Sequence, residues 1–190
     1  MNHKKYMKPI GNKEIKYKGK IIAVTNQLFD LNGKEVVFEF AERAPGVRMI
    51  VEKDEKILLT KEYRNETKSY DYRLAGGKVF DRLEDYLAYV NTSNEVQEAA
   101  EVALKKEAKE ELGIEVISSK LSHVSVCGAT INWNLYYFII TDLNELDEQE
   151  LEDGEDIKLS WFSKDEVREI CLNGEISEER SAIALLRYIN

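Results

Sequence analysis

Three glutamates, Glu107, Glu110 and Glu111, share one side of the helix that residues 92–114 are predicted to form. On a helical wheel of about 100° per residue, Glu107 and Glu111 fall in the middle of the apolar stripe, and Glu110 falls on its edge. Carboxylates that face a core are costly as bare charges, so something must pair with them. The nearest lysines point the other way, which favours a bound cation. Mg²⁺ or Mn²⁺ takes such oxygen ligands, and positions i, i+3 and i+4 converge on one ion.

Residue types that start and stop helices mark both ends of this segment. Thr92 and Glu95 have the spacing of a capping box, and Gly113 stands where a left-handed C-terminal residue is common. A solvated, Glu-rich surface helix is the alternative interpretation. The alternative is disfavoured because the glutamates are in phase with an apolar stripe, which consists of Val96, Ala100, Ala103 and Leu104.

The same glutamates carry a resemblance to a known motif. Glu98, seven further residues and then Lys106 to Ile114 resemble the Nudix box of the Nudix hydrolases. That box has Arg-Glu, an apolar residue, any residue, Glu-Glu, any residue, Gly and an apolar residue. The chain departs from it in two places. Lys106 replaces the arginine and loses the planar fork. About fifteen extra residues also separate Glu98 from Gly77, which we assign as the box glycine.

The resemblance implies a metal site and a catalytic group. It makes Glu107, Glu110 and Glu111 ligands of Mg²⁺, with Mn²⁺ possible, and adds a carbonyl from Gly76. In the ADP-ribose pyrophosphatase branch of the family, a carboxylate on a late loop activates the attacking water and another joins the metals. The acidic stretch of residues 142–156 looks like that loop, and its candidates for base and ligand, in either order, are Asp153 and Glu155.

Two arginines are candidates for contacts with the substrate. The Tyr-Arg pair that ends at Arg64, followed by the Gly76-Gly77 segment, resembles the same branch. Arg64 and Arg43 would contact the substrate, because a guanidinium pairs bidentately with phosphate oxygens. The alternative for both is an ordinary surface arginine. Trp133 could stack on a base, or it could belong to the core.

The order of expected elements predicts an α/β (α+β) fold of the Nudix type, an α/β/α sandwich around a mixed sheet. Residues 20–29 and 34–42 read as two strands joined by the Asn32-Gly33 turn, which gives a small antiparallel β-ribbon subdomain over residues 1–44. Residues 45–190 form the hydrolase domain, with an insertion at about 81–92. The spacing of Leu83, Leu87 and Val90 favours a short helix there, which caps the site, contacts a partner subunit or is surface decoration.

Composition limits the classes of function. A net charge of -9, with 43% hydrophobic and 33% charged residues, fits a soluble globular protein and argues against nonspecific nucleic-acid binding. The longest apolar run, residues 135–140, is too short to span a membrane, and residues 1–11 have no signal-peptide pattern, so a cytoplasmic enzyme is expected. Cys127 and Cys171 are too few for a disulfide framework, and we expect both to be buried or incidental.

Together with the resemblance, these features predict hydrolysis of a pyrophosphate linkage in a small-molecule nucleoside diphosphate derivative. ADP-ribose, cleaved to AMP and ribose 5-phosphate, is the expected substrate. The resemblance also implies a homodimer in which the N-terminal ribbon reaches the other subunit. Two alternatives stay open. One is a Nudix hydrolase for a nucleotide sugar, NADH or a dinucleoside polyphosphate, and the other is a non-catalytic sensor of ADP-ribose.

Overall fold

The computed structural model describes residues 7–190 apart from 66, 93, 147, 152–153 and 155. By its internal contacts the chain divides into two compact units. Unit 1 takes the described residues of Met1–Pro45, Phe80–Asn94 and Val126–Asn134. Unit 2 takes the described residues of Gly46–Val79, Glu95–Ser125 and Leu135–Asn190. The insertion predicted at about 81–92 therefore belongs to the unit of the N-terminal strands.

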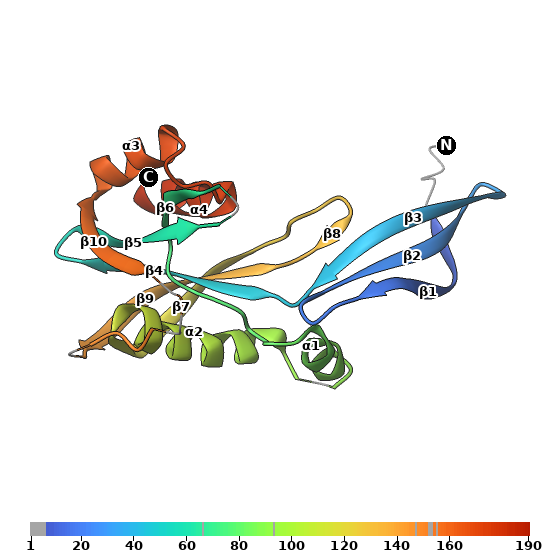
Figure 1. The fold of residues 1–190 in the computed structure, drawn as a ribbon, viewed down its shortest axis with the longest axis horizontal. Coiled ribbons are helices and arrows are strands. Elements are labelled where there is room, and N and C mark those ends of the chain that lie inside the picture. Colours follow the sequence, from blue (N-terminus) through green and yellow to red (C-terminus); the bar gives the residue numbers. More distant parts are fainter. Residues whose placement is uncertain (1–6, 66, 93, 147, 152–153, 155) are drawn as a thin grey trace. The chain divides into compact units, whose positions relative to one another are not determined.

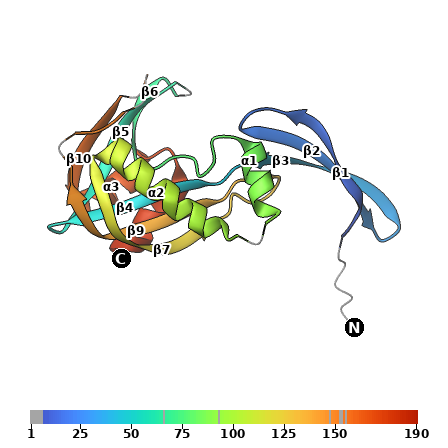
Figure 2. The ribbon, with the colours of Figure 1, turned by 90° about the horizontal axis from the view of Figure 1, so that it is seen from below.

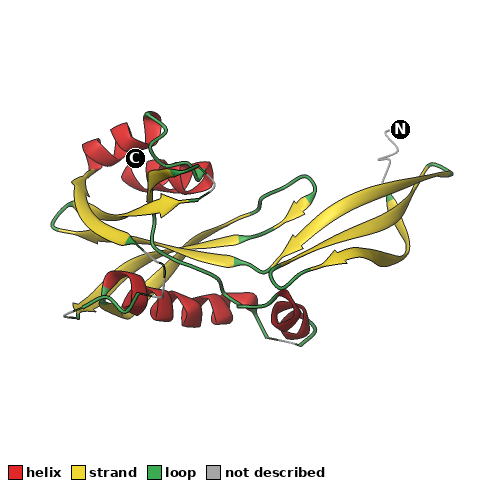
Figure 3. Cartoon of the chain, viewed as in Figure 1, coloured by secondary structure: helices red, strands yellow, loops and turns green. Residues whose placement is uncertain are grey.

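A four-stranded sheet forms unit 1 (Figure 3), with the order β1 (Lys8–Lys18), β2 (Ile22–Leu31), β3 (Lys34–Arg43) and β8 (Ile131–Asn132). The first three strands are antiparallel, and β8 is parallel to β3. The predicted turn is confirmed, because Asn32 and Gly33 have φ values of 57° and 83°, as a tight hairpin turn requires. The ribbon has a third long strand that the sequence did not reveal. Every residue of β1 is exposed, so β1 carries no alternation of buried and exposed positions.

The insertion of unit 1 contains the short helix α1 (Leu83–Val90). Leu83 is buried, and its N–H donates a 2.8 Å hydrogen bond to the carbonyl of Lys20. Leu87 and Val90 are exposed. The predicted helix is confirmed. Of its three apolar residues at helical spacing, Leu83 is buried, whereas Leu87 and Val90 are not.

Unit 2 is built on a six-stranded mixed sheet (Figure 1). The order is β10-β5-β4-β9-β7, and β6 pairs with β5. Pairing is parallel between β4 and β9 and antiparallel elsewhere. The strands are β4 (Gly46–Lys53), β5 (Lys56–Arg64), β6 (Ser69–Arg73), β7 (Ile114–Ser125), β9 (Leu135–Glu145) and β10 (Ile157–Ser163). The two strands expected within residues 114–126 are one continuous strand, β7, whose register shifts mark the irregular stretch between them.

Helices cover both faces of this sheet (Figure 2), as the predicted α/β/α sandwich requires. The helix α2 (Val96–Leu112) packs on β7, β4 and β9, while α3 (Lys164–Leu172) packs on β10, β5 and α4 (Glu179–Ile189). Val47 and Met49 of β4 share a core with α2. Arg48 between them points to the other face, where it meets Glu178 just before α4. None of the described helices is long and apolar enough to cross a membrane.

One predicted end of α2 is wrong and the other is confirmed. The N-cap of α2 is Glu95, without a side-chain cap, whereas the Thr92 hydroxyl donates a 2.6 Å hydrogen bond to the carbonyl of Tyr89. Thr92 therefore closes α1 and does not begin α2. Gly113 ends α2 in the left-handed conformation with a φ of 62°, as predicted. A reciprocal capping box, formed by Ser163 and Glu166, starts α3.

Candidate active site

The predicted carboxylate face of α2 is present in the structure. Glu111 is 8% exposed and lies among the buried residues of the helix, while Glu107 and Glu110 are half-buried. The buried apolar residues of the same stripe are Ala100, Ala103, Leu104, Ala108 and Leu112. The wheel therefore placed the carboxylates correctly, since period and phase alone decide which side of a regular helix meets the sheet.

The glycine segment of residues 75–77 lies against these carboxylates. It runs antiparallel to β4, because the N–H of Val47 donates to the Gly77 carbonyl and the N–H of Met49 donates to the Ala75 carbonyl, each at 3.0 Å. The N–H of Gly76 donates a 2.7 Å hydrogen bond to Oε2 of Glu111. The backbone thus approaches the end of α2 and fixes the buried carboxylate.

Neither glycine of the segment can carry a side chain without displacing a neighbour. Gly76 has a φ of +139°, and a Cβ there would overlap the carbonyl of Val47. A Cβ at Gly77 would overlap the carboxylate of Glu107. The two glycines therefore let one short stretch of backbone lie directly against two carboxylates of α2.

These groups suit a hard divalent cation. Burial raises the pKa of Glu111 to about 8, the hydrogen bond from Gly76 opposes the shift, and the negative charge of Glu107 adds to it. A divalent cation would favour the ionised form, and carboxylate and peptide oxygens are the donors that Mg²⁺ and Mn²⁺ prefer. In the described part of the chain, no three Asp, Glu, His or Cys side chains stand close enough together to hold a metal as they are.

Glu110 has a partner that the sequence analysis placed elsewhere. Lys106 lies 3.0 Å from its carboxylate, one helical turn away. The expectation that all nearby lysines point away from the glutamates is therefore wrong for Lys106, because its long side chain reaches along the helix surface. Glu107, Glu111 and the Gly76 segment are brought together, while Glu110 is paired with a lysine.

The acidic loop after β9 begins against the C-terminal end of α2. The N–H of Leu146 donates to the Gly113 carbonyl at 2.7 Å, and the N–H of Glu150 donates to the Glu110 carbonyl at 2.9 Å. The side-chain amide of Gln149 also donates to the Glu111 carbonyl. The candidates Asp153 and Glu155 lie outside the described residues. What is described of the loop is anchored at the carboxylate-bearing turn of α2.

Comparison with known proteins supplies the family. The sequence model of the NUDIX domain matches residues 42–183, which is most of the chain. The chain belongs to the Nudix family. Its fold is similar to that of a solved structure described as "Crystal structure of ADP compounds hydrolase", with a TM-score of 0.71 and 18% identity, over 96% of this chain and 92% of that one. Among curated protein sequences, none matches this chain.

In this Nudix chain, the two parts of the interrupted box still lie together. The extra residues between Gly77 and the helix leave unit 2 after Val79 and belong to unit 1 until Asn94. Gly77 nevertheless lies against the carboxylate of Glu107 in α2. Glu98, the other glutamate of the motif, is exposed near the start of α2. The interruption is therefore accommodated outside the unit that holds the three glutamates of α2.

The two candidate arginines occupy different units of the Nudix chain. Arg64 ends β5 in unit 2, and its guanidinium lies 3.5 Å from the carboxylate of Glu62. Arg43 ends β3 in unit 1, where its guanidinium lies 4.2 Å from the ring centre of Trp133. A guanidinium can pair bidentately with phosphate oxygens, so both arginines have the chemistry to contact a phosphate.

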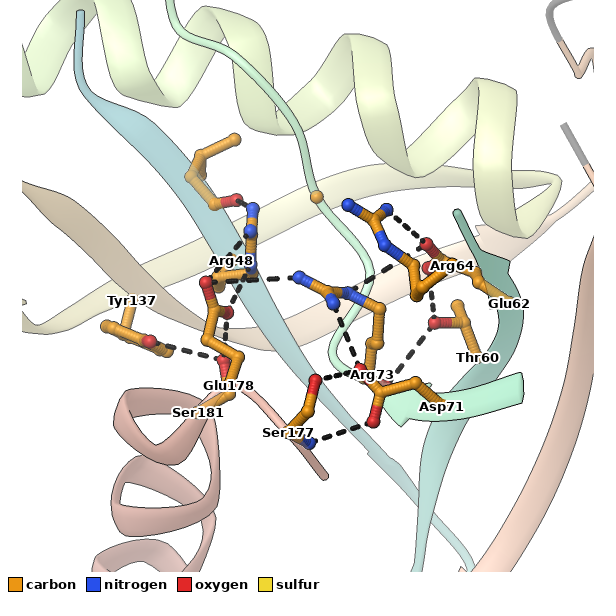
Figure 4. Close-up of polar contacts among 12 residues, drawn as sticks. Arg48, Thr60, Glu62, Arg64, Asp71, Arg73, Tyr137, Ser177, Glu178 and Ser181 are labelled. Carbon is orange, nitrogen blue, oxygen red and sulfur yellow. Dashed lines mark hydrogen bonds and ion pairs between the residues drawn. The ribbon is translucent and has the colours of Figure 1, made fainter. Parts of the chain in front are cut away.

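A buried polar network beside the glycine segment was missed by the sequence analysis (Figure 4). Arg48 and Arg73 both point toward Glu178, at 2.9 Å and 3.9 Å. Arg73 also lies 3.1 Å from Asp71, which accepts a hydrogen bond from the hydroxyl of Ser177 at 2.6 Å. One signal was available, because Arg48 interrupts an apolar strand and a charge there must have a partner. No sequence pattern could have named Glu178 as that partner.

Proposed function

We propose that this Nudix protein hydrolyses the pyrophosphate linkage of a nucleoside diphosphate derivative, with ADP-ribose as the substrate and AMP and ribose 5-phosphate as the products. The observation that carries the proposal is the hydrogen bond of 2.7 Å from the N–H of Gly76 to Glu111, beside Glu107. It joins the glycine segment to the carboxylates of α2, as a diphosphate-cleaving metal site needs.

The metal of the proposed site is Mg²⁺, with Mn²⁺ as an effective substitute. Its ligands are the carboxylates of Glu107, Glu110 and Glu111, the carbonyl of Gly76 and, from the late loop, Glu155. Bound there, the metal would neutralise the diphosphate and lower the pKa of a water molecule. Glu110 would exchange its contact with Lys106 for the cation, which costs little because Lys106 is exposed and ion pairs at the surface contribute little.

The proton of the attacking water would pass to a carboxylate near the end of α2. Our candidates for this general base are Asp153 and Glu155, with Glu110 as the carboxylate that α2 itself supplies. Support comes from the described start of the loop, where Glu150 and Gln149 bind the carbonyls of Glu110 and Glu111. A general base must lie within hydrogen-bond reach of the water that it activates, and the described start of this loop already contacts the turn that carries Glu110 and Glu111.

Arg64 and Arg43 would bind the substrate's phosphate oxygens. Arg64 is partly exposed, so its guanidinium is accessible to an anion while Glu62 limits its orientations. Arg43 is held against Trp133, which restricts its rotamers before a ligand arrives. Trp133 would in turn offer an aromatic surface to the base.

We further propose that the active form is a cytoplasmic homodimer. The support for dimerisation is the amount of apolar surface on the strands of unit 1, where Ile15, Tyr17 and Val37 are 61%, 58% and 56% exposed. A small sheet with such a surface gains stability when another chain covers it. Its test is the molar mass in solution by light scattering, with residues 1–45 present and absent.

The experiment that tests the function is a substrate panel with Mg²⁺. ADP-ribose, NADH, nucleotide sugars and dinucleoside polyphosphates are incubated with the wild type, Glu111→Gln and Glu101→Gln, and the products are separated by chromatography. Glu101 is exposed on the same helix, so its variant controls for the loss of a charge from α2. We expect AMP from ADP-ribose with the wild type and Glu101→Gln, and none with Glu111→Gln. If only another member of the panel were hydrolysed, that compound would replace ADP-ribose as the substrate. If ADP-ribose bound without being hydrolysed, the protein would be a sensor.

A further inference from the structure

Arg48 lies directly across from Gly76 in the backbone pairing of unit 2. Hydrogen bonds join Val47 to Gly77 and Met49 to Ala75 on either side, and Gly46 pairs with Lys78 in the same antiparallel register. The fit is tight, because a Cβ at Gly76 would stand 3.0 Å from Cα of Arg48. The residue whose N–H binds Glu111 therefore lies against the backbone of Arg48, between hydrogen bonds that Val47 and Met49 donate to its two neighbours.

The side chain of Arg48 ties this point of β4 to the start of α4. Its guanidinium donates to both carboxylate oxygens of Glu178, at 2.9 Å and 3.3 Å, and a third hydrogen bond of 2.9 Å goes to the carbonyl of Val47. The same carbonyl borders Gly76 on the side where a Cβ would stand. Arg48 is 8% exposed, so these bonds form away from water and are strong.

Glu178 is itself held firmly, as Figure 4 shows. It occupies the N-cap position of α4 and accepts a 2.6 Å hydrogen bond from the hydroxyl of Ser181, which in turn lies 3.2 Å from the hydroxyl of the buried Tyr137. The guanidinium of Arg73 approaches its other side. Arg48 is thus attached to an anchor in the helical layer, on the opposite face of the sheet from α2.

We propose that the ion pair of Arg48 and Glu178 is a positioning pair for the metal-binding segment. It holds β4 against Gly76, so that the N–H of Gly76 and the carboxylate of Glu111 keep the geometry that a divalent cation needs. Neither residue touches the metal or the substrate. The inference rests on the proposed metal site. It adds one supporting residue from β4 and one from the N-terminus of α4.

The ordinary alternative is an ion pair that only stabilises the fold. Breaking a buried pair is destabilising wherever it occurs, so a loss of stability cannot distinguish the two roles. They differ in metal affinity. Loss of groups that orient metal ligands typically weakens metal binding by about ten- to a hundredfold, whereas a purely stabilising pair leaves the affinity of the folded protein unchanged.

A second ion pair of the same strand provides a matched control. Glu52, near the other end of β4, lies 2.8 Å from Lys164 at the start of α3 and also accepts a hydrogen bond from Tyr188. Like the proposed pair, it joins β4 to the helical layer through a glutamate. It is six residues from Gly46, where β4 begins beside the glycine segment, so it should not affect the metal site.

The test measures Mn²⁺ binding to the full chain by the electron paramagnetic resonance signal of free Mn²⁺, without substrate. The variants are Arg48→Met, Arg48→Lys and Glu178→Gln, with Lys164→Met and Glu52→Gln as controls. We expect the dissociation constant to rise about ten- to a hundredfold in Arg48→Met and Glu178→Gln, and to stay at the wild-type value in the controls. Arg48→Lys should rescue only part of the loss, because an ammonium cannot reproduce the planar fork.

Denaturant unfolding of each variant, compared with its Mn²⁺ affinity, separates the two roles. Variants that are less stable but bind Mn²⁺ as the wild type does would overturn the inference and leave the proposed function standing. A wild type that binds no Mn²⁺ would overturn both. If Arg48→Met does not fold, Arg48→Lys and Glu178→Gln decide by the same criterion. A double variant that loses no more affinity than either single one would support the pair acting as a unit.

Discussion

Gly77 and Glu107 lie so close together that a Cβ on the glycine would overlap the carboxylate of the glutamate. The backbone of Gly77 is not in the left-handed region, so alanine is permitted there, and the atoms it would displace are the flexible end of a side chain. We therefore expect Gly77→Ala to fold with an unfolding free energy within about 1 kcal/mol of the wild type. Its Mn²⁺ affinity should fall about tenfold or more, measured by titration, because Glu107 is pushed from its place.

The neighbouring Gly76→Ala should behave in the opposite way. Its φ of +139° and the adjacent Val47 carbonyl leave no room for a Cβ, and the obstructing atoms belong to the backbone of a central strand. We expect a loss of about 2 kcal/mol or more in unfolding free energy, measured with urea. A stable Gly76→Ala, or a Gly77→Ala that binds metal normally, would contradict the arrangement of the segment.

The stability of the wild type should depend on the ionisation of Glu178. Burial opposes the charge, but the Arg48 guanidinium and the Ser181 hydroxyl outweigh it and hold the pKa of Glu178 below its ordinary value of 4.5. A pKa that is lower in the folded state gives stability that is complete above pH 4.5 and is lost as the pH falls through the folded value. Glu178→Gln should cost about 3 kcal/mol at pH 7, and the difference from the wild type should shrink below about pH 4.

That comparison has a simple control. Glu145 forms an ion pair with Lys53, but its side chain is 63% exposed. Glu145→Gln should therefore change the unfolding free energy by no more than about 0.5 kcal/mol at either pH. Thermal or urea unfolding at pH 7 and at pH 3.5 gives all the values. A constant difference between the wild type and Glu178→Gln at both pH values would exclude the ion pair as its cause.

The stacked pair of unit 1 predicts a spectroscopic signal. Trp133 and Trp161 are the two tryptophans of the chain, and only Trp133 lies against a candidate substrate-binding arginine. Addition of ADP-ribose should quench the fluorescence of Trp161→Phe, which keeps Trp133, and leave Trp133→Phe unchanged. Arg43→Ala should raise KM about tenfold or more with a smaller effect on kcat, because its contact is made in the ground state as well. If quenching persisted in Trp133→Phe, the base of the substrate would not stack on Trp133.

The two cysteines should differ in reactivity. Burial raises the pKa of the Cys171 thiol to about 11, whereas Cys127 is exposed. A chromogenic disulfide reagent at pH 8 should label one thiol of the native protein and two after denaturation, because the thiolate is the reactive form. Cys127→Ser should abolish the native reaction. Two fast thiols in the native state would contradict the packing of Cys171 on α3.

Patterns among residues close in sequence correctly predicted several features of the structure. The period of α2 placed Glu107 and Glu111 toward the sheet, Gly113 marked the end of the helix, and the Asn32-Gly33 turn joined β2 to β3. These features depend on residues close in sequence, whose burial follows the geometry of a single helix or hairpin. The glutamates of α2 and Gly113 also belong to the motif that resembles the Nudix box. Local patterns could not reveal β1, which has no buried face to produce a period.

Only the tertiary structure decided how distant residues meet. Gly77 and Glu107 are separated by an insertion that belongs to another unit, so the box glycine could be assigned but its contact could not. Arg48 and Glu178 are 130 residues apart. Within unit 2, the pairing of β4 with the glycine segment and the packing of α4 on the opposite face bring these groups together. Long-range pairing follows from the shape of the whole core, which no local period encodes, so the candidate metal ligands were visible in the sequence and the residues that support them were not.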